Sequence, residues 1–128
     1  MTEEEFNKYL ESIGGLENGY YTDREPITSA GFFELGPGWY GMLKNLIDEL
    51  IAAGWDKQLC QAKEKFGTLR FYVNATNSEC HKIISKYEDI SSTVCEKCGE
   101  PGELRQGGWI STLCDKDSGG REPFPSRP

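Results

Sequence analysis

The chain has 128 residues, of which 37% are hydrophobic and 12% aromatic, and its net charge is −7. This length suits one compact domain, and the aromatic content is too high for a disordered chain. The mean hydropathy is −0.59 and every apolar stretch is broken within a few residues, so we expect no segment to span a bilayer. The N-terminus, Met1-Thr2-Glu3-Glu4-Glu5, lacks the apolar core of a secretory signal. We therefore expect a soluble protein of the cytoplasm with no membrane partner.

The charge is unevenly distributed along the sequence. Residues 1–56 carry eleven acidic side chains against three basic ones, whereas residues 57–90 carry six basic side chains against four acidic ones. Duplex DNA should repel so acidic a chain over most of its surface, so we do not expect duplex DNA as a partner. The basic stretch could still hold a small anionic ligand.

The N-terminal region begins with a capping-box pattern. Thr2 can accept a hydrogen bond from the amide of Glu5, whose side chain can reach back to Thr2. Apolar residues then recur on one helical stripe until Gly14-Gly15, so we predict a helix over residues 3–13. Residues 15–38 show no clean period. We expect an ordered, irregular segment there with room for one short strand, in which four aromatic residues cover the core: Tyr20, Tyr21, Phe32 and Phe33.

The most regular apolar pattern lies between Pro37 and Gly54. Pro37 suits a helix start, and apolar side chains recur every three to four residues from Trp39 to Ile51. Gly54 ends the predicted helix. Trp39 and Trp55 flank this helix, and we expect both to anchor the core.

A hairpin is predicted next, with strands over residues 57–63 and 68–74 around a turn at residues 64–67. In the second strand Leu69, Phe71 and Val73 point to one face. Burying this set against the helices leaves Arg70 and Tyr72 on the opposite face of the sheet.

The last third of the chain is predicted to contain a helix and a second hairpin. Asn77 or Ser78 can cap the helix, and residues 102–105 and 109–113 form the strands around Gln106-Gly107-Gly108. From residue 119 the chain is rich in Gly and Pro, which predicts a disordered tail over residues 119–128. Residues 1–118 are thus expected to form one α+β domain, with helices packed on a small antiparallel sheet and a zinc-binding subregion at residues 94–118.

The cysteines indicate a metal site. Five cysteines in a chain without a secretory signal argue for reduced thiols, some of them bound to metal; Cys60 and Cys80 occupy apolar patterns and are expected to be buried. Two residues between thiolates let one tight turn present both sulfurs to one cation. Zinc also accepts carboxylate oxygen, so a closed site for a structural Zn²⁺ can be built from Cys95, Cys98, Cys114 and Asp117. We call the sequence Cys95-Glu96-Lys97-Cys98-Gly99 the knuckle. The alternatives to this site are Asp115 or a water as the fourth ligand, or a knuckle that binds no metal.

Three thiolates with a weak fourth ligand would also suit a catalytic zinc that holds water. A nucleobase deaminase, however, needs a His-x-Glu pair before its cysteine pair, and His81-Lys82-Ile83 lacks the glutamate. His81 is the only histidine, so no other Cys/His or Ser/His pair can be built. We therefore expect no enzymatic activity; a metal-dependent hydrolase, the remaining alternative, would need an open metal position and a nearby general base.

The order of knuckle, hairpin and second ligand pair resembles a treble-clef zinc finger. Several motifs together also resemble one family of small, largely uncharacterised proteins of bacteriophages, prophages and bacteria. These motifs are Gly38-Trp39-Tyr40, the run from Lys63 to Tyr72, Cys95-x2-Cys98-Gly99-x-Pro101-Gly102, Gly108-Trp109 and Thr112-Leu113-Cys114. The likeness extends from about Phe32 to Asp117, where members of the family typically have histidine. The resemblance implies a phage or bacterial origin and a zinc-binding C-terminus, and it implies no established reaction.

A candidate ligand surface lies on the first predicted hairpin. Lys63, Lys65, Arg70 and Tyr72 gather basic and aromatic groups there, and Arg105 joins them if the zinc hairpin packs nearby. Arginine can fork onto phosphate or carboxylate, lysine adds a point charge and tyrosine can stack on a base. The alternative is a solvated strand face whose charges pair with Glu64 and the acidic N-terminal part.

Two hypotheses on function follow. The first is a non-enzymatic, metal-stabilised binding protein of phage type, whose ligand is a host protein or a nucleotide-like anion and which counteracts a host defence in the host cytoplasm. The second is a nucleic-acid-associated zinc protein of phage transcription or replication, which predicts binding to single-stranded DNA or RNA that weakens with salt. No heptad pattern argues for a homo-oligomer, and that state stays open.

Overall fold

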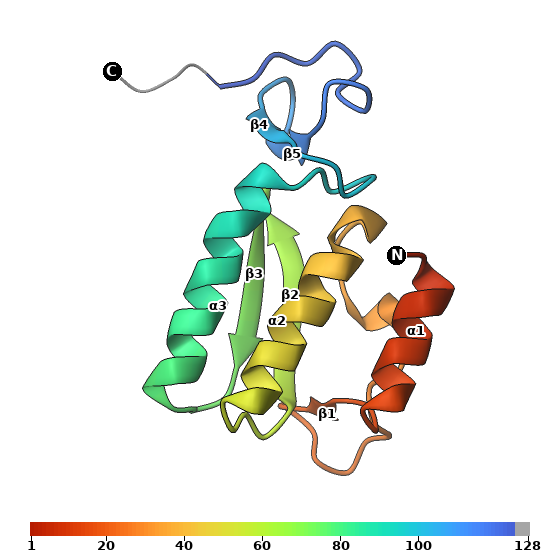
Figure 1. The fold of residues 1–128 in the computed structure, drawn as a ribbon, viewed down its shortest axis with the longest axis vertical. Coiled ribbons are helices and arrows are strands. Elements are labelled where there is room, and N and C mark those ends of the chain that lie inside the picture. The colour runs from red at the N-terminus through yellow and green to blue at the C-terminus, as the bar shows by residue number, and fades with distance from the viewer. Residues whose placement is uncertain (125–128) are drawn as a thin grey trace.

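The computed structural model describes residues 1–124 and has the expected α+β architecture (Figure 1). Its helices are α1 (Glu3–Ser12), α2 (Tyr40–Ala52) and α3 (Ser78–Ile90). Its strands are β1 (Glu17–Asn18), β2 (Gln58–Lys65), β3 (Thr68–Val73), β4 (Glu103–Arg105) and β5 (Ser111–Leu113), and short 3₁₀ turns occupy Ala30–Phe32, Pro37–Trp39 and Ser91–Thr93. Every helix in the described part of the chain is too short or too polar to cross a bilayer.

Local sequence signals set the ends of the helices. The capping box at α1 is confirmed: the Glu5 amide donates to Thr2 Oγ1 over 3.1 Å, and the Thr2 amide donates to Glu5 Oε1 over 2.9 Å. At α3, Asn77 is the cap, and its Oδ1 accepts from the amide of Cys80 at 2.8 Å. These side chains satisfy amides that the first turn of a helix leaves without a partner.

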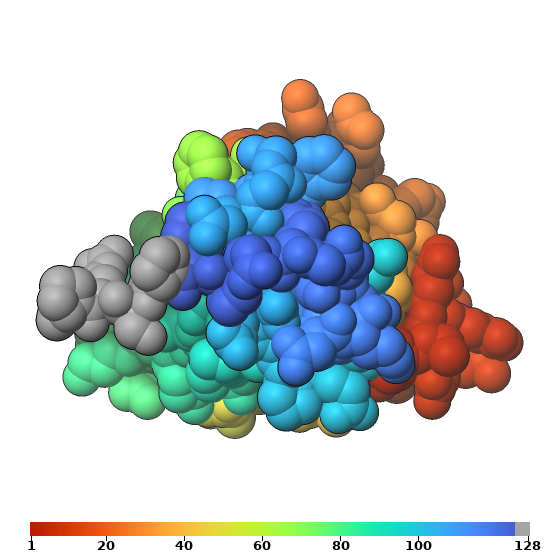
Figure 2. Space-filling view, turned by 90° about the horizontal axis from the view of Figure 1, so that it is seen from above, coloured from red at the N-terminus to blue at the C-terminus, as the bar shows by residue number. Residues whose placement is uncertain are grey.

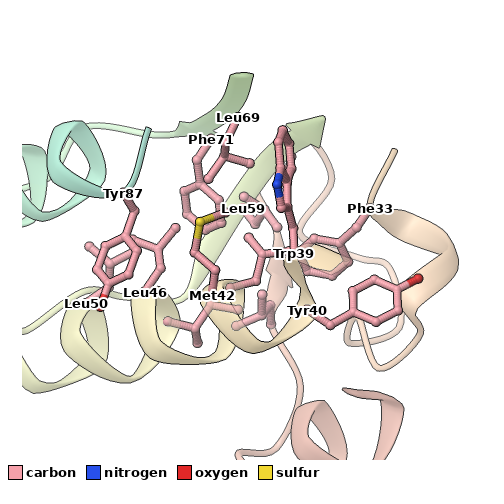
Figure 3. Close-up of a cluster of buried hydrophobic side chains, with 14 of the residues drawn as sticks. Phe33, Trp39, Tyr40, Met42, Leu46, Leu50, Leu59, Leu69, Phe71 and Tyr87 are labelled. Atoms are coloured by element: carbon pink, nitrogen blue, oxygen red, sulfur yellow. The ribbon is translucent and has the colours of Figure 1, made fainter. Parts of the chain in front are cut away.

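The core lies between the helices and one face of the larger sheet. This sheet has the order β1-β2-β3, with β1 parallel and β3 antiparallel to β2. In Figure 1, α2 lies in front of β2 and β3, α3 lies beside β3, and α1 flanks α2. Figure 3 shows side chains of α2, among them Leu46 and Leu50, pointing toward Leu59, Leu69 and Phe71 of the strands. The predicted inward face of β3 is therefore confirmed.

The two expected tryptophan anchors are both buried, but their indole N–H groups differ. Trp39 is fully buried, and its Nε1 donates to the carbonyl oxygen of Val94 over 2.8 Å. Trp55 packs its ring against Phe71 with the ring centroids 5.8 Å apart. Its Nε1 is buried without a hydrogen-bond partner among the described residues.

The segment between α1 and α2 is irregular, as predicted, and contains β1. Phe33 is buried, but Tyr20 and Tyr21 are 66% and 53% exposed, so the expectation that they cover the core is wrong. The reason is a turn closed by Asn18, whose Oδ1 accepts hydrogen bonds from the amides of both tyrosines at 2.9 and 3.1 Å. This turn directs the chain, and both rings, away from the core.

Two tyrosine–carboxylate pairs connect the helices. Tyr9 of α1 donates its hydroxyl to Asp48 of α2 over 2.6 Å, and Tyr87 of α3 donates to Glu49. Each carboxylate also pairs with a lysine, Lys44 at 2.9 Å and Lys86 at 2.6 Å respectively. The adjacent residues Asp48 and Glu49 of α2 thus connect this helix to α1 and to α3.

The free edge of β3 is covered by α3 and the turn that follows it. The amide of Leu69 donates to Ser91 Oγ over 2.8 Å, and the amide of Phe71 donates to Glu88 Oε2 over 3.0 Å. The opposite edge of the sheet pairs with β1 and, through an isolated bridge to Lys63, with Glu34.

The strands β4 and β5 form an antiparallel pair above the end of α3. Residues 121–124 lie along β4: Gln106 donates its amide to the Glu122 carbonyl, and Phe124 donates to the Leu104 carbonyl. The prediction of a disordered tail from residue 119 is therefore corrected over this stretch, because backbone pairing needs no particular side chains. Residues 125–128 of that predicted tail lie outside the described residues. Figure 2 shows this C-terminal part, in blue, spread across the top of the molecule.

Candidate metal centre

The site begins with a tight turn at Cys95–Cys98. The amide of Gly99 donates to the Cys95 carbonyl over 2.9 Å, and the amide of Cys95 donates to the Glu100 carbonyl over 2.8 Å. Gly99 has φ +84°, a conformation that side chains with a Cβ rarely adopt. The glycine after the second cysteine therefore allows the turn that presents both sulfurs.

Four donor atoms converge where this turn meets the end of β5. One ligand atom from each of Cys95, Cys98, Cys114 and Asp117 lies within 4.8 Å of all the others. The Sγ atoms of Cys98 and Cys114 are 3.6 Å apart, and Asp117 Oδ2 lies 3.4 Å from Cys95 Sγ and 3.3 Å from Cys114 Sγ. These four residues are the set that the sequence predicted, and they could hold a metal ion.

The spacing of the donors matches a tetrahedral ion. Zinc binds thiolate at about 2.3 Å and carboxylate oxygen at about 2.1 Å, so a regular tetrahedron separates two sulfurs by about 3.8 Å and a sulfur and an oxygen by about 3.6 Å. The three donor–donor distances given individually above fall within about 0.3 Å of these edges. The residues present are therefore close enough together to hold a four-coordinate cation.

The surroundings of the cluster favour an anionic sulfur at Cys95. Burial opposes ionisation of this thiol, but hydrogen bonds from the backbone at Cys114, Cys98 and Lys97 outweigh that effect and lower its pKa. The pKa of Asp117 is also lowered, because the thiols of Cys98 and Cys114 donate to its carboxylate. At Cys98, a backbone hydrogen bond at Glu100 favours the thiolate, but Asp117 and the other thiols prevail and raise the pKa to about 12. A cation among these donors would relieve the mutual repulsion of the anions.

Asp115, the alternative fourth ligand, has a different role. Its Oδ1 accepts from Arg105 Nη2 over 2.8 Å, and its side chain is 99% exposed. Arg105 itself is buried and also donates to the carbonyl oxygens of Leu113 and Arg121, at 3.2 and 3.1 Å. Arg105 therefore holds the C-terminal segments together and does not reach the ligand surface for which the sequence proposed it.

Close backbone packing joins the knuckle to the start of α2. The amide of Gly38 donates to the Glu96 carbonyl over 2.7 Å, and the amide of Gly36 donates to the Glu96 carboxylate over 2.9 Å. A Cβ at Gly38 would lie closer than 3.0 Å to the carbonyl oxygen of Cys95. Burial raises the pKa of Glu96. The sequence Gly36-Pro37-Gly38-Trp39 before α2 thus forms the surface on which the knuckle packs. Neither this packing surface nor the hydrogen bonds that Glu96 makes to it were predicted from the sequence.

A second contact places β4 and β5 on the turn between β2 and β3. Thr112 is fully buried, and its Oγ1 donates to the Gly67 carbonyl over 2.7 Å. Gly67 has φ +84°, and a Cβ there would lie 2.6 Å from Leu104 Cδ2. The C-terminal module, residues 94–124, is thereby fixed against both the helical layer and the sheet.

The other predicted ligand residues lie on the outer face of β2–β3. Lys63 is paired with Arg70 across the two strands, Tyr72 is 42% exposed, and Lys65 lies at the exposed end of β2. In the part of the chain that the structure describes, no carboxylate lies within 4.0 Å of the charged nitrogens of Lys63, Lys65 or Arg70. The structure thus brings these four side chains to one face and leaves Arg105 in the C-terminal module.

Comparison with models of protein families, with curated proteins and with solved structures finds no match for this chain. Two features of the structure bear on its chemistry. One is the cluster of three thiols and a carboxylate, and the other is the group of basic side chains on the outer face of β2–β3.

Proposed function

We propose that the chain is a non-enzymatic binding protein whose C-terminal module is held by a structural zinc ion. The observation that carries the zinc site is the convergence of Cys95, Cys98, Cys114 and Asp117 within 4.8 Å. Three thiolates favour zinc over hard cations such as Mg²⁺ or Ca²⁺. Four protein donors complete a tetrahedron and leave no position for a substrate or a reactive water, which supports a structural role.

The small hydrophobic core of the C-terminal module explains why a metal ion would be needed to stabilise it. Its buried apolar cluster comprises Cys95, Leu113 and Cys114, of which two are in the donor set. So few apolar side chains cannot offset the conformational entropy lost when this region is ordered. Metal binding supplies that free energy in small modules of this kind.

The binding function is proposed for the outer face of β2–β3. Lys63 and Arg70 are adjacent there, Lys65 and Tyr72 lie on either side of them, and the chain as a whole is acidic. A local group of cations on an acidic protein concentrates a small anion at one place and repels it elsewhere. We propose a nucleotide-like anion as the ligand, with a host protein as the alternative. Following the resemblance to small phage-encoded proteins, we propose that this binding counteracts a host defence in the host cytoplasm.

The zinc site is tested by native mass spectrometry and elemental analysis of the purified protein. We expect one zinc ion per chain in the wild type and in Cys60→Ser, because Cys60 is buried outside the donor set. Cys114→Ser should lose the metal. A wild-type protein without stoichiometric metal, or a Cys114→Ser variant that retains it, would contradict the proposal.

The ligand face is tested by calorimetric titration with ATP. We expect Lys63→Ala/Arg70→Ala to weaken binding by tenfold or more, on the scale of about 1.5 kcal/mol for each charge-assisted hydrogen bond. Lys82→Ala is the matched control, since Lys82 is an exposed cation on α3. Equal affinities for ATP in the double variant and the control would show that the outer face of β2–β3 is not the binding site.

A further inference from the structure

Two exposed aromatic side chains line the same cavity where the two hairpins touch. Phe66, in the turn between β2 and β3, is 66% exposed, and Trp109, in the loop before β5, is 74% exposed. Together with Glu64, Gly108 and Ile110 they line one open cavity of about 400 Å³. In Figure 2 the yellow-green tip of the β2–β3 hairpin lies beside the blue C-terminal part, which agrees with this contact.

The backbone at Phe66 is unusual for an aromatic residue. Phe66 and Gly67 are the central residues of a two-residue turn, and their φ values are +53° and +84°. Turns of this type favour Asn, Asp or Gly at both positions, because a Cβ is poorly tolerated there. Phe66 therefore occupies a disfavoured conformation although its ring contributes little to the core. Such strain is concentrated at functional sites, where the side chain is used for binding.

The loop that carries Trp109 is held in place by Arg121. Arg121 donates to the carbonyl oxygen of Gln106 over 3.1 Å and to that of Trp109. Its guanidinium lies 5.7 Å from the centre of the Trp109 ring. The exposed indole is thus presented by an anchored loop, which reduces the entropy lost when a ligand stacks on it.

Cations connect this aromatic pair to the outer sheet face. Lys65 Nζ lies 5.7 Å from the centre of the Phe66 ring, and Lys63, Arg70 and Tyr72 follow along the strands. From Lys65 to the level of Tyr72 is four residues of β2, or about 13 Å at the usual strand rise. A row of cations of this length suits a strand, which carries one phosphate per nucleotide along its backbone, better than a mononucleotide, whose charge lies at one end.

Glu64 is the carboxylate that also faces the cavity. Its Oε2 accepts from the amide of Gly67 over 2.7 Å, so this hydrogen bond directs the charge toward the turn. A phosphate is therefore expected on the lysine side of Phe66, and an uncharged base in the cavity beside Glu64.

We propose that this surface binds single-stranded nucleic acid, with bases stacked on Phe66 and Trp109 and phosphates on Lys65, Lys63 and Arg70. This inference rests on the anion-binding face of the proposed function and specifies its ligand as a strand. Stacking tolerates any base, because every base has a π face, so the surface selects single strands over duplexes with little sequence preference.

Binding is measured by fluorescence anisotropy of a labelled thymidine oligonucleotide of about twelve residues, a length within the usual site sizes. Trp109→Ala should weaken binding about tenfold, as expected for loss of one stacked base. Phe66→Asn should weaken it by a similar factor while the melting temperature stays level or rises, because Asn suits the turn. Tyr20→Ala is the matched control, since Tyr20 is an equally exposed aromatic in the loop after β1.

Three further measurements separate the outcomes. A plot of the logarithm of the binding constant against the logarithm of salt concentration should have a slope of about −2. This slope corresponds to three phosphates bound by three cations. Equal affinity for duplex and single strand, or wild-type affinity in both Phe66→Asn and Trp109→Ala, would overturn the inference. If ATP or thymidine monophosphate binds and the oligonucleotide binds no better, the inference fails and the proposed function stands. If neither binds, the inference and the nucleotide-like ligand of the proposed function both fail, whatever the zinc content.

Discussion

The indole nitrogen of Trp39 donates to the carbonyl oxygen of Val94, 2.8 Å away, across the boundary between the helical layer and the C-terminal module. Trp39 precedes α2, and Val94 directly precedes the first cysteine of the knuckle. This hydrogen bond therefore couples the folding of the core to the position of the metal donors.

We expect Trp39→Phe to destabilise the protein by about 1–3 kcal/mol more than Trp55→Phe. Both changes remove the same atoms from the core, but the first leaves the Val94 carbonyl without its partner, whereas Trp55 Nε1 has no partner to lose. Urea unfolding of the two variants measures the difference. Equal losses of stability would show that the hydrogen bond contributes nothing.

Substitution of Gly38 tests the close packing between the knuckle and the segment before α2. Gly38→Ala places a Cβ against the backbone of Cys95 and Glu96, so it should displace the knuckle, lower the zinc affinity and cost on the order of 2 kcal/mol of stability. Gly41→Ala is the control, because a Cβ there meets no atom within 4 Å and alanine favours the helix by about 1 kcal/mol. Thermal unfolding with and without a chelator distinguishes the two. A harmless Gly38→Ala would contradict the close packing described above.

The identity of the fourth donor can be tested at two aspartates. Asp117→Ala should weaken zinc binding by about 100-fold or more, a loss at least as large as that caused by removing an outer-shell partner of a metal ligand. Asp117→Cys should restore or exceed wild-type affinity, whereas Asp115→Ala should leave it unchanged, because Asp115 pairs with Arg105. Competition with a chromophoric chelator measures all three. A larger effect at Asp115 than at Asp117 would reverse the assignment.

The pair between Glu49 and α3 makes stability depend on pH. Hydrogen bonds from Lys86 and Tyr87 hold the pKa of Glu49 below its ordinary value of 4.5. A lowered pKa in the folded state stabilises the protein above about pH 4.5, and this contribution is lost as the pH falls further. Glu49→Gln should therefore cost about 0.5–1 kcal/mol at pH 7, a figure reduced for the partly exposed position, and progressively less as the pH falls from 4.5 toward 3.

The measurement is urea unfolding of wild type and Glu49→Gln over this pH range. Comparing the two chains cancels the acid-induced loss of metal, which affects both equally. Glu4→Gln serves as the control, since Glu4 and Lys8 are largely exposed and 3.6 Å apart. A difference between wild type and Glu49→Gln that does not change with pH would contradict the role given to the ionised carboxylate.

Features encoded by neighbouring residues could be predicted from the sequence. The capping box of Thr2 and Glu5, the alternation of Leu69 and Phe71, and the knuckle at Cys95 each depend on contacts a few residues apart. The convergence of Cys114 and Asp117 on the knuckle also followed, because ligand spacing restricts the geometries that one cation can accept.

Features that depend on distant contacts could not be predicted. Arg105 has the composition of a surface cation, but acceptors at Leu113, Asp115 and Arg121 bury it in the C-terminal module. Residues 121–124 pair with β4 through backbone atoms, which the Gly- and Pro-rich composition of residues 119–128 does not reveal. The exposure of Phe66 depends on the turn geometry, which a Phe-Gly pair does not indicate by itself.

The covering of β3 by Ser91 and Glu88 has a consequence in the crowded cell. An uncapped strand offers a ready template on which a neighbouring molecule can extend the sheet, and this is how many small β-containing proteins begin to form fibrils. With the amides of Leu69 and Phe71 already engaged, that route is obstructed along this edge. The hairpin that exposes the ring of Phe66 is thereby protected from extension at this edge of the sheet.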